Sequence, residues 1–433
     1  DAIGTQVVDT LESWLRRPKA VALQARGMIV GRRFSPQAFE AAKACGIRCF
    51  TPEDLERALV DFSPYLNRLI ADFANSALAQ YYVAQQVQTE KDEQVVDLLQ
   101  HGLAWAGGES SRLWVLLGDY GTGKTAFTRR FAYELAQQAL GRTSAEATMP
   151  LLINLRDYPN KTSLGDILHE HWHRQTGERR DPAIFLHLLA RGRIVLLLDS
   201  FDEMGISQAH RNVVEQFRML AQPTGAAGDQ VRANRVLVTC REQFFREHGE
   251  ALQAVQGQSD RLAALEQAAR GFDGAIDVLQ RFSDEQIREY LRKRLGEDEG
   301  CRAWLAIDRL YNLKSLADRP QLLEMIIDSL PDLLRAGQTV TPGALYLRYT
   351  NRWLEDPAIR PADRQSSSGE LRGVLEALAV ELWRRDGQRI HHADLYTLIT
   401  RRGDLRGRHD PIVLDVELRT AAFLSRTGDG YYG

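Results

Sequence analysis

The fold is decided by residues 113–125, "LWVLLGDYGTGKT", in which an apolar run leads directly into a glycine-rich loop. Gly118 to Thr125 fits the phosphate-binding pattern G-x-x-x-x-G-K-S/T at every fixed position. This pattern is informative only where it follows a strand and begins a helix. Here an apolar run precedes it and the helical pattern "AFTRRFAYEL" follows, which argues against a chance glycine turn. The stretch therefore predicts a strand, a phosphate loop and a helix in succession.

The loop predicts a nucleotide site with defined groups. Glycines let backbone amides surround a phosphate, and the helix N-terminus adds partial positive charge. We expect Lys124 to reach the β- and γ-phosphates and the Thr125 hydroxyl to bind Mg²⁺. The residues expected to line the nucleotide are Gly118, Tyr120, Gly121, Thr122, Gly123, Lys124, Thr125 and Ala126. ATP or ADP, with Mg²⁺, is the expected cofactor.

A second apolar run, residues 194–203 or "IVLLLDSFDE", ends in three carboxylates. In a protein with a phosphate loop, Asp199 at the end of such a strand would hold Mg²⁺ through water. Asp202 and Glu203 lie in the turn that follows, where a carboxylate can activate the water that attacks the γ-phosphate. Glu203 is favoured as this base because its side chain is longer, and Asp202 is the alternative.

A third strand pattern, "RVLVTCRE" at residues 235–242, ends in Thr239 and Arg241. A guanidinium at this place can bind the γ-phosphate and so distinguish a triphosphate from a diphosphate. A surface arginine in a loop is the alternative interpretation of Arg241.

The alternation of apolar runs and helical patterns between residues 111 and 275 predicts an α/β fold with a parallel sheet covered on both faces. Residues 63–110 have a helical pattern and would form a linker. The strand signal fades after about residue 275, so 276–341 and 342–433 are expected to be helical domains, with a short hairpin at the end. Residues 1–62 alternate two strands with helices, which is half of an α/β domain, and its other half is expected before Asp1.

The length, charge and cysteine content of the chain limit the classes of function that it can have. The chain has 433 residues, 44% of them hydrophobic, and a net charge of −3, so no overall field attracts it to nucleic acid or membrane. No apolar run approaches the roughly 18–20 residues of a membrane span. Four cysteines are too few for a disulfide framework in a chain of this length, which favours a reducing cytoplasm.

Several stretches together resemble the NACHT subgroup of the STAND class of P-loop ATPases. They are "LLLDSFDE" (196–203), "PLLINLRDY" (150–158), "LVTCRE" (237–242), "RFSDEQIREYL" (281–291), "LADRPQLLEMI" (316–326), "LYLRYTNRWL" (345–354) and "LEALAVELWRRDGQRI" (375–390). The resemblance implies a nucleotide-binding domain at 111–275, a small helical domain at 276–341 whose Pro320 packs on the base, and a winged-helix domain at 342–433. The histidine that the winged helix supplies in this class is not in the sequence, which ends at "FLSRTGDGYYG".

The same resemblance implies a switch in which ADP holds the domains closed and ATP opens them. Opening would let copies assemble into a homo-oligomer, expected as a tetramer, after a C-terminal sensor binds a phage protein. Residues 1–62 resemble the C-terminal half of Mrr-like restriction endonucleases, which implies DNA as the substrate of an N-terminal effector in antiviral defence. A death-fold adaptor or a plain α/β spacer is the alternative for this segment.

Other functions stay open beside the switch. A DNA-dependent restriction-type ATPase subunit would hydrolyse ATP steadily on DNA, and a nucleotide-gated scaffold would assemble without chemistry of its own. The stretch "HEHWH", His169 to His173, fits the zinc metalloprotease pattern H-E-x-x-H, but it falls in the helix between two strands of the expected sheet and lacks a clear third ligand.

Overall fold

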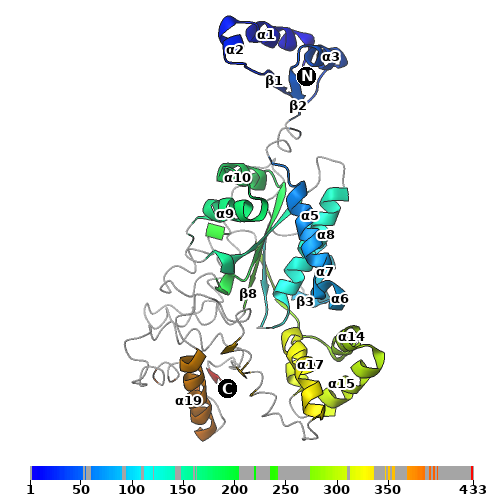
Figure 1. Cartoon of the computed structure of the whole chain (residues 1–433), viewed down its shortest axis with the longest axis vertical. Coiled ribbons are helices and arrows are strands. Elements are labelled where there is room, and N and C mark those ends of the chain that lie inside the picture. Colours follow the sequence, from blue (N-terminus) through cyan, green and yellow to red (C-terminus); the bar gives the residue numbers. More distant parts are fainter. Residues whose placement is uncertain are drawn as a thin grey trace.

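The computed structural model describes residues 2–51, 54, 60–89, 94–108, 112–119, 121–141, 148–158, 161, 163–203, 219–220, 235–241, 274–309, 313–335, 347, 350–351, 354–355, 368–385, 390–391, 394, 397 and 431–432. Within these residues the chain forms an N-terminal unit, a central sheet flanked by helices, and a helical unit at the opposite end (Figure 1). None of the helices in these ranges combines the length and the apolar composition that a membrane crossing needs.

The centre of the molecule is a seven-stranded sheet in the order β4-β3-β9-β5-β8-β7-β6. Its strands are β3 (Gln86–Thr89), β4 (Val95–Asp97), β5 (Leu113–Leu117), β6 (Met149–Asn154), β7 (Ile194–Asp199), β8 (Arg235–Cys240) and β9 (Gly274–Leu279). The strands from β9 to β6 are parallel, as the sequence predicted, whereas β3 and β4 are antiparallel to their neighbours. The phosphate-loop strand β5 and the acidic strand β7 are separated by β8 alone.

The first three strands of this order, β4, β3 and β9, differ from the structure predicted for these residues. Residues 86–89 and 95–97 are strands, although the stretch 63–110 was expected to be helical throughout. Val87 is fully buried and Gln86 is exposed, which is the two-residue period of a half-buried strand rather than a helical one. The strand β9 lies where the strand signal was expected to fade. It carries the buried Asp277, which accepts a hydrogen bond from Trp114 Nε1 at 2.9 Å, and this polar residue hides the strand pattern.

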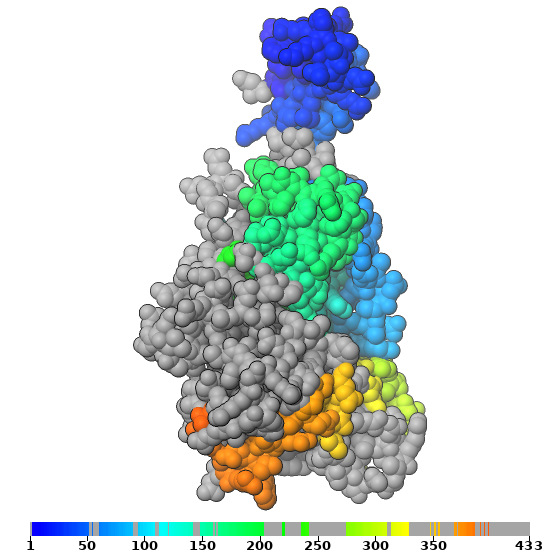
Figure 2. Space-filling view, turned by 60° about the vertical axis from the view of Figure 1, so that its left-hand side comes forward, coloured from blue at the N-terminus to red at the C-terminus, as the bar shows by residue number. Residues whose placement is uncertain are grey.

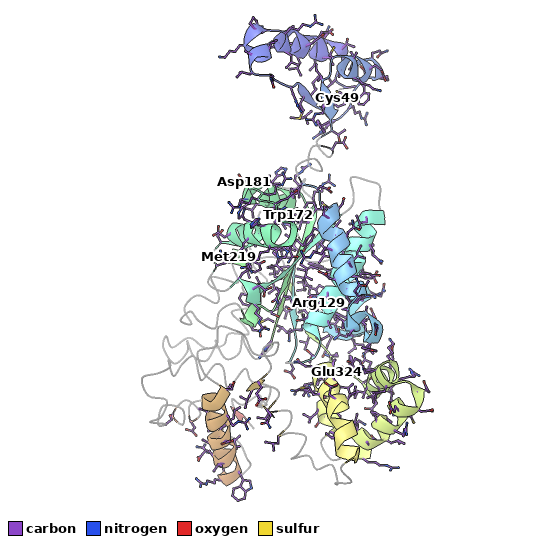
Figure 3. The ribbon with its side chains drawn as sticks, in the orientation of Figure 1. Cys49, Arg129, Trp172, Asp181, Met219 and Glu324 are labelled. Atoms are coloured by element: carbon purple, nitrogen blue, oxygen red, sulfur yellow. The ribbon has the colours of Figure 1, made fainter. Side chains whose placement is uncertain are left out.

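Both faces of the sheet are covered, so the interior strands are apolar on both sides. In β5, Leu113, Val115 and Leu117 face one core and Trp114 and Leu116 face the other. The covering helices are α5 (Ser63–Ala74), α7 (Leu98–Gly107), α8 (Lys124–Gly141), α9 (Leu164–Thr176) and α10 (Pro182–Ala190), and the short helix α6 (Ala77–Tyr81) follows α5. Trp172 on α9 is buried in the first core (Figure 3). A strand buried on both faces must be a continuous apolar run. This explains why the residues of β7 that precede Asp199 are all apolar.

The N-terminal unit stands apart at one end of the molecule (Figure 2). It consists of α1 (Thr5–Leu15), α2 (Pro18–Ala22), β1 (Met28–Val30), α3 (Pro36–Ala44) and β2 (Arg48–Phe50), with β1 and β2 parallel. The Ser35 side chain caps α3 by accepting a hydrogen bond from the Ala38 amide at 3.1 Å. The strand–helix–strand order agrees with the prediction for residues 28–50, while most of the helix expected at 51–62 lies outside the described residues.

The helical unit comprises α14 (Asp284–Leu295), α15 (Glu297–Arg309), α16 (Lys314–Ala317) and α17 (Pro320–Arg335), and we use this name for residues 281–335. It shares its core with Val83, from the segment that precedes β3. Two further bonds join that segment to α14, because Gln286 Nε2 donates to Ala84 O at 2.6 Å and Lys293 Nζ donates to Tyr82 O at 2.7 Å. The unit is therefore attached to the edge of the sheet as well as to the end of β9.

Of the expected winged-helix domain, the described residues include α19 (Ser368–Arg384) and the antiparallel pair β10 (Ile390–His391) and β11 (Tyr431–Tyr432). The described strand at the end of the chain, β11, pairs with β10, and the other residues of the expected terminal hairpin lie outside the described part of the chain. Most of residues 342–433 lies outside the described part of the chain, so the winged-helix prediction stays a prediction.

Candidate nucleotide-binding site

The phosphate loop connects β5 to α8, as the sequence predicted. Gly121 and Gly123 have φ values of +75° and +102°, which favour glycine. An added Cβ at Gly123 would lie 2.5 Å from Gln85 Nε2. Gln85 is itself buried and donates a hydrogen bond from Nε2 to Thr122 O at 2.8 Å. The loop is thus supported from outside by a side chain that the sequence analysis did not single out.

The Lys124 ammonium lies inside the curve of this loop. It donates hydrogen bonds to Gly118 O at 2.7 Å and to Asp119 O at 3.0 Å. Burial lowers the pKa of Lys124, and the neighbouring Asp202 carboxylate opposes that shift. A buried ammonium with carbonyl oxygens as acceptors is suited to bind an anion, since phosphate oxygens are stronger acceptors than carbonyls.

Asp199 ends β7, and its carboxylate accepts hydrogen bonds from the hydroxyl groups of Thr125, Thr239 and Ser200, the last at 3.3 Å. Its Oδ2 accepts a hydrogen bond from Thr125 Oγ1 at 2.7 Å, and its Oδ1 accepts one from Thr239 Oγ1 at 2.6 Å. The next residue, Ser200, has a φ of +62° and donates from its amide to Thr239 Oγ1 at 3.0 Å. The unusual backbone of Ser200 therefore turns the chain sharply away from the sheet directly after the carboxylate.

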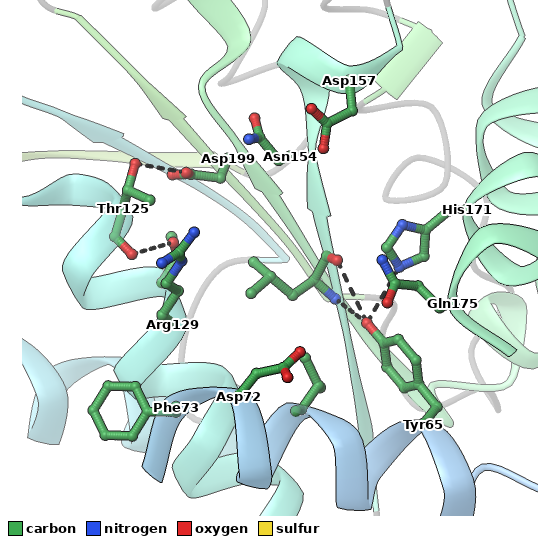
Figure 4. Close-up of a pocket in the computed structure, with 13 residues that line it drawn as sticks. Tyr65, Asp72, Phe73, Thr125, Arg129, Asn154, Asp157, His171, Gln175 and Asp199 are labelled. Carbon is green, nitrogen blue, oxygen red and sulfur yellow. Dashed lines mark hydrogen bonds between the residues drawn. The ribbon is translucent and has the colours of Figure 1, made fainter. Parts of the chain in front are cut away.

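The donor set at this point fits a magnesium ion. A carboxylate and a hydroxyl oxygen are hard ligands, and Mg²⁺ keeps several waters when proteins bind it in this way. Thr125 and Asp199 also line a cavity of about 430 Å³ that leaves room for such waters (Figure 4). Asn154 is the register partner of Asp199 on β6 and lines the same cavity. Asn154 is not among the residues predicted from the sequence, although it lies at the polar end of the apolar run in "PLLINLRDY".

The far end of this cavity is formed by a buried histidine. His171 Nε2 lies 3.3 Å from Tyr65 Oη and its Nδ1 lies 3.1 Å from Tyr158 Oη. Burial lowers the pKa of His171 to about 4, so the imidazole is neutral at pH 7. His169, the first histidine of the H-E-x-x-H stretch, forms a hydrogen bond through Nδ1 with Arg180 O at 2.6 Å. The described residues contain no group of three or more His, Cys, Asp or Glu side chains that could hold a metal ion.

Arg241 and Asp202 form a buried ion pair beside the loop. Arg241 Nε lies 2.7 Å from Asp202 Oδ2, and the Arg241 amide donates to Asp202 Oδ1 at 3.2 Å. Asp202 is thereby held by Arg241. Asp202 is one of the two carboxylates that the sequence offers as a base. The side chain of Glu203 and the whole of Tyr120 lie outside the described residues.

The N-terminus of α17 contacts the phosphate loop. The Gln321 amide donates to Gly121 O at 3.2 Å, and Pro320 is the first residue of α17. Arg281 lies between the two parts, with Nη2 2.5 Å from Asp119 Oδ2 and Nη1 3.3 Å from Asp318 Oδ2. Glu324, further along α17, accepts hydrogen bonds from α14 side chains (Figure 3). The predicted residue Pro320 is thus next to the loop, while its contact with a base stays a prediction.

Comparison with known proteins agrees with this geometry. Residues 112–298 match the NACHT domain family. An uncharacterized WD repeat-containing protein of Nostoc sp. is 27% identical over 322 residues, which are 69% of this chain and 20% of that protein. The chain thus spans about a fifth of the length of this relative. The NACHT resemblance of the nucleotide-binding part is therefore confirmed.

Two solved structures are similar at a lower level. The Aeropyrum pernix ORC2 protein in its ADPNP–ADP complexes is 12% identical, with a TM-score of 0.40 over 77% of this chain and 87% of that one. Drosophila ORC bound to DNA is 16% identical, with a TM-score of 0.37 over 82% and 87% of the two chains. Scores of this size do not establish a common fold.

Proposed function

We propose, from the NACHT domain at residues 112–298, that this chain is an ATP-binding and ATP-hydrolysing switch of the STAND type. The observation that carries the proposal is the convergence of Lys124, Thr125, Asp199 and Arg241 at one end of the parallel sheet. Phosphoryl-transfer sites require an ammonium that binds phosphate, two oxygen ligands for Mg²⁺ and a guanidinium that binds the transferred phosphate.

Each group has a part in this proposal. The loop amides and Lys124 bind the β- and γ-phosphates, and Thr125 and Asp199 hold Mg²⁺, which neutralises charge on the phosphates. Arg241 contacts the γ-phosphate. Glu203 orients the attacking water and accepts its proton, because Asp202 is engaged by Arg241 at 2.7 Å. Thr239 fixes the orientation of Asp199 through its 2.6 Å hydrogen bond.

The switch depends on the contact between the loop and α17. A nucleotide can change the shape of a protein only if it binds one state better than another. The bond from the Gln321 amide to Gly121 O joins the helical unit to the part of the loop that surrounds the phosphates. Loop rearrangement on exchange of ADP for ATP would therefore alter the docking of α17.

We further propose that the switch joins a sensor to an effector in antiphage defence. The printed name of the Nostoc relative includes WD repeats, which supports a repeat-built sensor that recognises a phage protein. The β1–α3–β2 order of residues 28–50 supports the endonuclease-like unit, with DNA as its substrate. Assembly of a homo-oligomer would activate this effector.

The proposal is tested first by nucleotide binding. Calorimetry with ADP and ATP in Mg²⁺ should give saturable binding to the native protein and none to Lys124→Ala. Lys161→Ala is the matched control, since Lys161 pairs with Glu170 at 2.7 Å on the surface. Absence of nucleotide binding by the native protein would refute the switch.

The alternatives give different results in the same preparations. Steady hydrolysis that DNA stimulates would favour a restriction-type ATPase. An Lys124→Ala or Asp199→Ala protein that still assembles and signals would favour a scaffold without chemistry. The switch predicts that both variants fail to activate.

A further inference from the structure

The buried pair of Arg241 and Asp202 bears on how the site distinguishes ATP from ADP. The guanidinium Nε and the carboxylate Oδ2 are 2.7 Å apart, and the two side chains are only 11% and 5% exposed. A second bond, from the Arg241 amide to Asp202 Oδ1 at 3.2 Å, fixes the carboxylate in place. The charge of Asp202 is therefore directed at Arg241 and is screened little by solvent.

The pair lies directly beside the phosphate loop. Arg241 follows Cys240, which is the register partner of Leu117, and the Gly118 amide donates to Cys240 O at 3.2 Å. Lys124 Nζ donates a hydrogen bond to the carbonyl oxygen of the same residue, Gly118, at 2.7 Å. Thr125, the residue after Lys124, donates a hydrogen bond to Asp199 Oδ2 at 2.7 Å. Two cations and the carboxylates of Asp199 and Asp202 thus share one buried region, in which their formal charges balance.

The β-phosphate, which ADP and ATP both carry, is assigned to the loop amides and Lys124, whereas only the γ-phosphate of ATP reaches Arg241 in the proposed function. The γ-phosphate brings additional negative charge toward Arg241, whose guanidinium is already neutralised by Asp202. Either Arg241 leaves Asp202, and a buried carboxylate loses its partner, or both anions share one cation. Both outcomes cost free energy that ADP avoids.

We propose that Asp202 restrains Arg241 and competes with the γ-phosphate for it, so that this carboxylate sets the preference of the site for ADP over ATP. The inference rests on the proposed function, in which Arg241 contacts the γ-phosphate. Asp202 is then a positioning residue that acts through Arg241, and the resting state is maintained within the site itself.

The test is a comparison of two affinities in the full chain. Calorimetry gives the Kd values for ADP and for a non-hydrolysable ATP analogue in Mg²⁺. Asp202→Asn, which has almost the same shape but no charge, should shift the ratio of the two Kd values about tenfold toward the ATP analogue, within the range of coupled binding effects. Asp202→Glu, which keeps the charge, should stay near the native ratio.

The same ratio in Arg241 variants separates the inference from its premise. Arg241→Gln should remove most of the preference between the two nucleotides, and an unchanged ratio would refute the role of Arg241 in the proposed function. If Arg241→Gln behaves as expected while Asp202→Asn leaves the native ratio unchanged, only the inference is overturned.

A double variant covers the case in which Asp202→Asn does not fold. Asp202→Asn combined with Arg241→Gln removes both charges of the buried pair together, so it is expected to fold. Because Asp202 acts through Arg241, this double variant should have the same ratio as Arg241→Gln alone. A different ratio would mean that Asp202 acts on the phosphate directly, which contradicts the proposal.

Discussion

Arg281 links the phosphate loop to the helical unit, and its removal should loosen the closed arrangement. The guanidinium lies 2.5 Å from Asp119 Oδ2 in the loop and 3.3 Å from Asp318 Oδ2 before α17. Arg281→Ala removes both contacts and leaves the bond between Gln321 and Gly121 in place. The variant therefore probes how strongly ionic contacts hold the helical unit on the nucleotide site.

The expected loss of stability of the closed arrangement follows from the solvent exposure of the Arg281 side chain. The Arg281 side chain is 44% exposed, and exposed ion pairs each contribute about 0.2–1 kcal/mol. Two such pairs give about 1 kcal/mol, which corresponds to about a fivefold change in an equilibrium constant. A much larger effect is not expected because solvent screens both pairs.

The assay is the dissociation of a fluorescent ADP analogue in a stopped-flow instrument. ADP should leave Arg281→Ala about fivefold faster than the native protein. Arg292→Ala is the control, since Arg292 lies on α14 and pairs with Glu297 at 3.9 Å within the helical unit. An ADP dissociation rate equal in Arg281→Ala and the control would refute the reasoning.

Three further predictions concern the loop, the metal ligands and the buried histidine. Gly123→Ala places a Cβ 2.5 Å from Gln85 Nε2 and should abolish nucleotide binding in calorimetry, whereas Gly107→Ala, with open space around it, should bind normally. Thr125→Val should bind ADP with an affinity that no longer responds to EDTA, because one Mg²⁺ ligand is lost; a native EDTA response would contradict this role. The folded-state pKa of His171, about 4, lies below its usual value of about 6.5, so its contribution to stability is complete above pH 6.5 and is lost as pH falls toward 4, by about 1.4 kcal/mol per unit. Chemical unfolding at several pH values should show a shallower slope in His171→Gln, and an unchanged slope would exclude His171 as the cause.

The sequence predicted those parts of the site that are contiguous and chemically distinctive. The loop around Lys124 and the carboxylate of Asp199 each follow an apolar strand, and parallel strands bring their carboxyl ends to one edge of the sheet. Their proximity follows from topology alone, and the hydrogen bond between Thr125 and Asp199 agrees with it.

Contacts between distant segments could not be predicted in this way. Gln85 and Thr122 meet because β3 is added to the sheet beside β9, and the segment of Gln85 has a composition that also suits a helix. The ion pair between Asp202 and Arg241 depends on the turn at Ser200. Ser200 has a positive φ, which cannot be predicted from the sequence because the residue is not a glycine. Side-chain pairing after such a turn is decided by local geometry rather than by residue type.

The segment before β3, residues 82–85, connects three parts of the molecule. It is bonded to the phosphate loop through Gln85 and to α14 through Ala84 and Tyr82, and it continues backward into α6 and α5, which lead to the N-terminal unit. A displacement of α14 must either break these bonds or pull on the segment. Motion of the helical unit is therefore coupled to motion of the chain that leads to the N-terminal unit, and this coupling does not require a contact between the two units.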